Sequence, residues 1–448
     1  MKPRRGKPSL ELEATVHELA PGGDGVAIAV IEGERRAVFM AGVVPGDRVR
    51  VAVDLAKRPA RGVVREVLTK SPDRVEARCA WVGACGGCDW MHVSHAAQLR
   101  AHEAHLRAAL PSAWREHAIA VHPAANEFAY RTRTRVHVQA TGGRAIVGMN
   151  EARTRDPVEV DVCAVLHPAL EAARARVASL LEGAHGRGEV QIALGSMTES
   201  MTGSKSGSSH RPAVIDLQWS GMLAPRCFAQ IDAAVKDGWL AGARITAGET
   251  RVPAKIGDAT PWIEAGDGAP LKLAPGGFGQ ASDEGNVALA RRVAAIVEGA
   301  CANKPDARVL ELYAGAGNFT VMLASLAKSV VAVESSREAC DAARVNLVAR
   351  GVEARAKIVE ADASAYEIPK PIHVVVLDPP RTGAREACTR LVSSSAKHIV
   401  YVSCDTPTLA RDLAILAPSF TPRSIDLFEL FPQTSHVESV VHLVRERP

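Results

Sequence analysis

From Arg308 onward, short apolar runs alternate with stretches of helical pattern, and three of the runs end in an acidic side chain. These acids are Glu334, Asp362 and Asp378, and the first run of the series leads into a glycine-rich turn. Strands that alternate with helices predict an open α/β sheet, whose ligands bind beyond the carboxyl ends of its strands. The C-terminal part of the chain is therefore predicted to be Rossmann-like, with a ligand crevice beside these acids.

The glycine-rich turn narrows the class of ligand. Gly315 and Gly317 allow the backbone to come close to a ligand at a helix N-terminus, but Thr320 replaces the third glycine of a dinucleotide fingerprint. Glu334 stands where a carboxylate can take two ribose hydroxyls, and Asp362 can hold the amino group of adenine. We expect a methyl-donor site, with a Rossmann-like domain that lacks such a cofactor as the alternative.

A cysteine follows a further apolar run, His398 to Ser403. Because Cys404 would leave the carboxyl end of a strand, its thiol is presented to the crevice and can be a nucleophile. The alternative is a small apolar residue that caps the core.

A second group of cysteines has the spacing C-x5-C-x2-C, and a fourth cysteine stands further along the chain. The four are Cys79, Cys85, Cys88 and Cys163. Four sulfur ligands suit an iron–sulfur cluster or a zinc ion, and buried cysteines without a shared role are the alternative. The nearby His92 and His95 are expected to face solvent on a helix and not to be ligands.

Residues 1–68 predict a small OB-type barrel, because five short β-type runs are separated by turns rich in glycine, proline and aspartate. The first run is expected at Glu13–Leu19. Basic residues of this segment can contact a phosphate backbone or form a solvated surface: Lys2, Arg4, Arg5, Lys7, Lys57, Arg58 and Arg61. The net charge of the chain, +4, is too small to decide between the two.

The middle of the chain offers an arginine stripe. Arg131, Arg133 and Arg135 would project from one face of a strand and fit an anionic polymer, or else mark a solvated edge strand. The segment Gly195–Ser209 is of low complexity and predicts a loop. Between Ala213 and Leu273 we expect alternating short strands and identify no chemistry.

The 448 residues divide into three predicted parts: 1–68, 69–274 and 275–448. No apolar run is long enough for a membrane span, and no signal peptide is evident, so a cytoplasmic protein is expected. A reducing compartment argues against disulfides among the nine cysteines. We expect a monomer.

Motifs along nearly the whole length resemble the RNA uracil-5 methyltransferases, and especially their iron–sulfur branch, which modifies large-subunit (23S) ribosomal RNA. The N-terminal barrel is similar to a TRAM domain, and the cysteine set and the arginine-rich Tyr130 segment fit the same family. The most specific motifs are Gly-Phe278-x-Gln280, Asp378-Pro-Pro-Arg, Tyr401-Val-Ser-Cys404-Asp and Phe431-Pro-Gln-Thr-Ser-His436-Val-Glu438. The low-complexity segment and the stretch up to Leu273 depart from the family pattern.

The resemblance implies a role for each motif. Cys404 would be the nucleophile and Glu438 the base, with His436 beside it. The donor S-adenosylmethionine or the substrate would be contacted by Gln280, Tyr313, Asn318, Glu334, Asp362 and Asp378. The four cysteines Cys79, Cys85, Cys88 and Cys163 would hold a 4Fe-4S cluster.

This chemistry explains the residue types. Carbon 5 of uracil is a poor nucleophile, and a thiolate that attacks carbon 6 makes carbon 5 able to take a methyl group. A base must then remove the carbon-5 proton so that the thiol can leave. The uracil must stand outside a helix to be reached. The alternatives are a transfer RNA substrate, a methyltransferase for small molecules or proteins, and a non-catalytic iron–sulfur RNA-binding protein.

Overall fold

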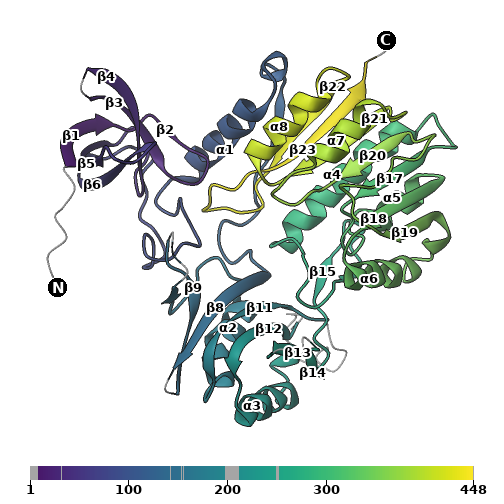
Figure 1. The fold of residues 1–448 in the computed structure, drawn as a ribbon, viewed down its shortest axis with the longest axis horizontal. Coiled ribbons are helices and arrows are strands. Elements are labelled where there is room, and N and C mark those ends of the chain that lie inside the picture. The colour runs from purple at the N-terminus through teal and green to yellow at the C-terminus, as the bar shows by residue number, and fades with distance from the viewer. Residues whose placement is uncertain are drawn as a thin grey trace.

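The computed structural model describes residues 9–31, 33–141, 143–152, 154, 156–196, 211–248 and 252–446. The basic tail with Lys2, Arg4, Arg5 and Lys7 lies outside the described residues, as does the Gly195–Ser209 segment beyond Ser196. Figure 1 shows that the three larger sheets occupy separate parts of the molecule. Within these ranges, every helix is too short or too polar to cross a membrane.

The N-terminal sheet has the strand order β1-β5-β6-β4-β3-β2. Its strands are β1 (Ser9–Thr15), β2 (Glu18–Leu19), β3 (Gly25–Ile31), β4 (Glu34–Met40), β5 (Arg48–Asp54) and β6 (Ala60–Thr69). Alternate residues of β5, Val49, Val51 and Val53, are fully buried in its core. The single strand predicted at Glu13–Leu19 was wrong, because the amides of Val16 and His17 donate to Asp47 and Val26 instead and separate β1 from β2.

The central sheet has the order β10-β9-β8-β11-β12-β13-β14. Its elements are β8 (Arg133–Thr141), β9 (Arg144–Asn150), β10 (Pro157–Glu159), α2 (Pro168–Leu180), β11 (His185–Leu194), β12 (Ala213–Met222), α3 (Pro225–Lys236), β13 (Leu240–Ala247) and β14 (Ala254–Gly257). Both helices pack on one face. The expectation of short strands alone beyond Ala213 was wrong, because Cys227, Ile231 and Ala234 are spaced to bury one side of α3. The opposite face lines an open cavity of about 1180 Å³.

The C-terminal sheet has the order β19-β18-β17-β20-β21-β23-β22-β7. Its strands are β7 (Ile119–His122), β17 (Arg308–Leu312), β18 (Ser329–Glu334), β19 (Ala356–Glu360), β20 (Val374–Leu377), β21 (His398–Ser403), β22 (Phe420–Phe428) and β23 (Glu438–Arg445). The strands from β19 to β21 are parallel, whereas β23 is antiparallel to both of its neighbours. The predicted Rossmann-like α/β architecture is confirmed, and its strand order reverses between β17 and β20.

Helices cover both faces of this sheet (Figure 1). They are α1 (His95–Ala109), α4 (Asp283–Cys301), α5 (Thr320–Leu326), α6 (Arg337–Val348), α7 (Arg385–Val392) and α8 (Thr406–Leu416). Alternate residues of each strand point to opposite faces, so that Val374 and Val376 pack with α4 and α5 while Val375 and Leu377 pack with α7 and α8.

The middle segment of the chain also contributes to this C-terminal body. Leu106 and Leu110 at the end of α1 join the core under α7 and α8, and β7 pairs with β22. The small sheet of β15 (Trp262–Glu264) and β16 (Pro270–Lys272) packs against α4 and α6. The division of the chain at residues 68 and 274 stays a prediction.

Candidate active site

The sheet register brings the predicted site residues to one edge. Leu312 pairs with Val333 on one side and Leu377 on the other, so Tyr313, Glu334 and Asp378 each stand at or just beyond the end of neighbouring strands. This edge is also where the strand order reverses, the usual place for a ligand crevice in an open α/β sheet. The three predicted residues therefore lie together at this edge of the sheet.

A pocket at this edge gathers four of the predicted donor contacts: Gln280, Tyr313, Asn318 and Asp378. Gly315 lines the pocket and belongs, with Gly317, to the glycine-rich turn, where the two residues have φ of 55° and 84°. Tyr313 has the same left-handed conformation, with φ of 64°. Glu334 fixes the turn because its carboxylate accepts the Gly315 amide at 3.0 Å. The exposed Asp362 lies at the next strand end, where it accepts the Ser364 amide at 2.8 Å.

Two residues that the sequence reasoning missed support this pocket. Asn286, fully buried in the first turns of α4, exchanges two amide hydrogen bonds with Asn318, of 3.1 and 2.8 Å. Glu311 is buried below the turn and accepts the Thr320 hydroxyl at 2.6 Å, and burial raises its pKa to about 8. No sequence motif marks either residue, since each acts through a partner that the fold brings to it.

Cys404 and Glu438 are brought together by strand pairing. Ser403 at the end of β21 pairs with Ser439 in β23, so Cys404, just beyond β21, and Glu438, the first residue of β23, stand at facing positions. Glu438 is 2% exposed, and burial together with the charge of Asp378 raises its pKa well above the ordinary value. Burial, with the nearby carboxylates of Glu438 and Asp378, also raises the pKa of the Cys404 thiol to about 12.

Arg381 is a cation close to Cys404 and Glu438, and the sequence analysis gave it no role. Its charge lowers the pKa of both Cys404 and Glu438, opposing the effect of burial. The guanidinium also lies 3.3 Å from Nε2 of His436. His436 stands beside Glu438 in the sequence, but its imidazole contacts Arg381, and the described residues show no hydrogen bond between His436 and Glu438.

The four cysteines Cys79, Cys85, Cys88 and Cys163 line one apolar pocket with Arg131. All are free thiols, and burial raises the pKa of Cys88 to about 12, with a further contribution from the other three thiols. Within the described chain no group of three or more His, Cys, Asp or Glu side chains is arranged to hold a metal ion. The structure therefore brings the predicted cysteines to one place and leaves the kind of centre open.

Two expectations about neighbouring residues were wrong. The arginine stripe is not an exposed face: Arg133 is 7% exposed and donates to the carbonyl of Gly277 at 3.0 Å, because the 275–280 segment covers the end of β8. Arg131 faces the cysteine pocket, and only Arg135 is exposed. His92 and His95 do not face solvent either, since each is held by a distant segment, at Val43 and Glu429 respectively.

An open α/β sheet with this strand order, a glycine turn at its switch point and an acid at the end of the next strand is the arrangement of a Rossmann-like domain that binds a ligand containing a nucleoside. A family model described as tRNA (Uracil-5-)-methyltransferase matches residues 282–373 and 357–446. The structure of the Pyrococcus abyssi tRNA (uracil-54, C5)-methyltransferase in complex with S-adenosyl-L-homocysteine has a TM-score of 0.73, with 22% identity over 97% of this chain and 100% of that chain.

Relatives match over nearly the whole length of the chain. The 23S rRNA (uracil(1939)-C(5))-methyltransferase RlmD of Methylococcus capsulatus is 31% identical, with 98% of each chain covered. The RlmD protein of Pseudomonas putida is also 31% identical, over 93% of this chain and 90% of that one. The chain belongs to the RNA uracil-5 methyltransferase family, and it is an enzyme that transfers a methyl group from S-adenosylmethionine to carbon 5 of uracil in RNA.

Proposed function

We propose that the substrate is 23S ribosomal RNA, at the uridine that the relatives' names place at position 1939, and that Cys404 and Glu438 carry the reaction. The observation that carries the assignment of the two residues is their facing position across β21 and β23, beside the donor pocket. A thiol and a buried carboxyl group at opposite positions can reach two edges of one flipped base.

In this proposal the Cys404 thiolate attacks carbon 6 of the uracil, and the electron pair of the 5,6 double bond moves toward carbon 5 and the carbonyl at carbon 4. Arg381 favours the thiolate by its positive charge. S-adenosylmethionine, when bound, supplies the methyl group that carbon 5 takes up. Covalent attachment divides one difficult step into two easier ones.

Glu438 then removes the proton from carbon 5, and the bond between carbon 6 and sulfur breaks to release the thiolate. Burial and the charge of Asp378 raise the pKa of Glu438, which makes its carboxylate a stronger base toward the carbon-5 proton. The contacts to S-adenosylmethionine or to the substrate are assigned to Gln280, Tyr313, Asn318, Glu334, Asp362 and Asp378. Asp378 is the one of these that can also face the uracil.

We further propose a 4Fe-4S cluster at Cys79, Cys85, Cys88 and Cys163, four thiols around one pocket. A zinc ion held by four sulfur atoms at about 2.3 Å is the alternative. A cluster binds each thiolate to a different iron and so accepts wider spacing. Four thiols without disulfides also fit a cytoplasmic location.

RNA is proposed to lie along the N-terminal sheet, as an OB-type TRAM module, and along the open face of the central sheet. Lys57 and Arg58 are exposed on the former, and Arg135 and Arg187 stand on the latter. Such cations supply affinity through phosphates and leave recognition of the target to the flipped base. A monomer is sufficient for this arrangement.

The substrate is tested by mapping 5-methyluridine in RNA from cells that lack the gene. We expect one 23S rRNA site to lose its methyl group and to regain it when the purified protein and S-adenosylmethionine are added. A transfer RNA substrate is the second candidate, because the matching family model and the similar structure both carry that substrate in their names. Loss of methylation in transfer RNA with unchanged 23S rRNA would decide for it.

A further inference from the structure

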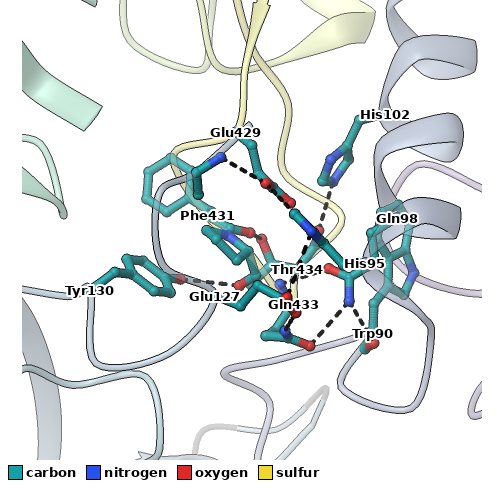
Figure 2. Close-up of polar contacts among 12 residues, drawn as sticks. Trp90, His95, Gln98, His102, Glu127, Tyr130, Glu429, Phe431, Gln433 and Thr434 are labelled. Carbon is teal, nitrogen blue, oxygen red and sulfur yellow. Dashed lines mark hydrogen bonds and ion pairs between the residues drawn. The ribbon is translucent and has the colours of Figure 1, made fainter. Parts of the chain in front are cut away.

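The segment between β22 and β23, residues 429–436, carries the chain into Glu438 and is covered by parts of the chain more than 300 residues earlier. Figure 2 shows this loop surrounded by side chains from α1, from the turn before α1 and from the 127–130 segment. The loop is almost wholly buried. Its conformation is therefore imposed by contacts with the rest of the molecule.

Gln433 is the centre of these contacts. It has a φ of 70°, a left-handed conformation that is unfavourable for a residue other than glycine. The amide of Gln433 donates to Oε1 of Gln98 at 2.9 Å, and Nε2 of Gln98 donates back to Oε1 of Gln433 at 3.1 Å. The carbonyl of Gln433 accepts the Trp90 amide at 3.0 Å, and its Nε2 donates to Glu127 at 3.2 Å. Every polar group of this residue is thus satisfied in the strained conformation.

The flanking residues of the loop are held in the same manner. The Tyr130 hydroxyl donates to the carbonyl of Pro432 at 3.1 Å, and Nε2 of His102 lies 2.9 Å from the carbonyl of Thr434. The carboxylate of Asp89 accepts both the amide and the hydroxyl of Ser435, at 3.2 and 2.8 Å. Asp89 directly follows Cys88, so the cysteine segment and α1 both form hydrogen bonds with the loop.

Glu438 itself has no comparable support. Its Oε1 atom is buried and has no hydrogen-bond partner among the described residues. The direction of the carboxyl group therefore depends on the backbone at the start of β23. Strand pairing with Phe428 of β22 holds this backbone from one side. The hydrogen bonds to residues 432–435 hold the segment that leads into it. A displacement of about 1 Å at a catalytic group can cost on the order of a hundredfold in rate.

We infer that Gln98 and Gln433 form an amide pair that positions the loop so that Glu438 faces carbon 5 of the uracil. Both are positioning residues, since neither touches the reacting atoms. This inference rests on the proposed role of Glu438 as the base. It assigns to α1, a helix outside the methyl-donor pocket, a part in the proton-removal step alone.

The test compares three variants of the full-length enzyme on 23S rRNA fragments. Gln98→Met keeps the size of the side chain and removes its four hydrogen bonds to Trp90, Val93 and Gln433. Arg100→Met, two residues on in the same helix and exposed, is the matched control. Glu438→Gln reports on the base itself. The measured quantities are the rate of methyl transfer in a single turnover and the fraction of RNA covalently attached to protein on a denaturing gel.

We expect Gln98→Met to transfer the methyl group at close to the wild-type rate, and to release the product on the order of tenfold more slowly. The covalent adduct should accumulate as it does in Glu438→Gln. Deuterium at carbon 5 should slow turnover of Gln98→Met more than that of the wild type, because proton removal has become limiting. A variant that was merely less stable would lose all steps together and show no such isotope effect.

The outcomes separate the two proposals. An adduct in Glu438→Gln, with Gln98→Met indistinguishable from Arg100→Met, overturns the inference and leaves the base assignment in place. Unchanged turnover and no adduct in Glu438→Gln rejects the base assignment. If Gln98→Met does not fold, Gln433→Gly takes its place, because glycine accepts the same φ and loses only the side-chain bonds. Wild-type release by that variant would equally overturn the inference.

Discussion

At Cys404, burial and neighbouring carboxylates oppose the reaction that the residue is proposed to perform. The raised pKa of about 12 keeps the thiol protonated near neutral pH. A thiolate is nevertheless the attacking species, so the residues that shift this equilibrium control the first step. Arg381 is the group that lowers the pKa.

Adduct formation should therefore rise with pH between about 6 and 9, because the thiolate fraction grows about tenfold per pH unit below the pKa. Arg381→Met should slow adduct formation, because loss of the positive charge raises the pKa of Cys404. The rate should fall roughly tenfold for each unit by which this pKa rises. Rapid quenching of the single-turnover reaction measures this rate. Arg385→Met, an exposed arginine a few residues away, is the control, and equal rates for the two variants would remove Arg381 from the account.

Asp378 gives a prediction for stability. Burial raises its pKa from 3.8 to about 7, so the folded state holds a proton that the unfolded state releases at lower pH. The stability that this group contributes is complete below about pH 4 and is lost as the pH rises toward 7. Asp378→Asn should thus raise the melting temperature by several degrees at pH 8 and by less at pH 5. A shift that is larger at pH 5 would contradict the sign.

At the scale of elements, the strand ends were predictable because a short apolar run that stops at an acid is a local pattern. The facing positions of Cys404 and Glu438 were not, since they depend on β23 being antiparallel to β21, and only the resemblance paired them. The prediction of an exposed arginine stripe was wrong for a related reason. Alternation along β8 was read correctly, but the sequence does not say that residues 275–280 cover Arg133.

The contact between β8 and the 275–280 segment yields a prediction about donor binding. A Cβ atom on Gly279 would lie 2.1 Å from Nη1 of Arg133 and 2.6 Å from the Leu273 side chain. Gly279→Ala should push the adjacent Gln280 out of the donor pocket and weaken binding of S-adenosylhomocysteine on the order of tenfold, as calorimetry can measure. Gly299→Ala in α4, with nothing within 4 Å, is the control. Unchanged affinity in Gly279→Ala would show that the segment adapts.

At the scale of the whole molecule, the cysteine segment connects all three sheets. It follows the N-terminal sheet in the chain, and its three cysteines share a pocket with Cys163 of the central part. Asp89 and Trp90, which come next, donate to or accept from the loop that leads to Glu438. A cluster bound to these four cysteines, as proposed above, would restrict the unfolded chain and hold the central sheet next to the catalytic body.

Anaerobically purified protein should therefore be brown and contain about four iron and four sulfide ions per chain. Replacing all four cysteines with serine should abolish the colour and lower the melting temperature. Elemental analysis and visible absorption provide the measurement. Stoichiometric zinc without iron would contradict the cluster and make this a structural zinc site.

Cys404→Ala tests the central claim most directly. A 23S rRNA fragment is incubated with each protein and labelled S-adenosylmethionine, and 5-methyluridine is identified by mass spectrometry of the digested RNA. The wild type should form it. Cys404→Ala should form none while binding S-adenosylhomocysteine as tightly as the wild type, because the thiol acts on the uracil and not on the donor. Full turnover by Cys404→Ala would contradict covalent catalysis through this residue.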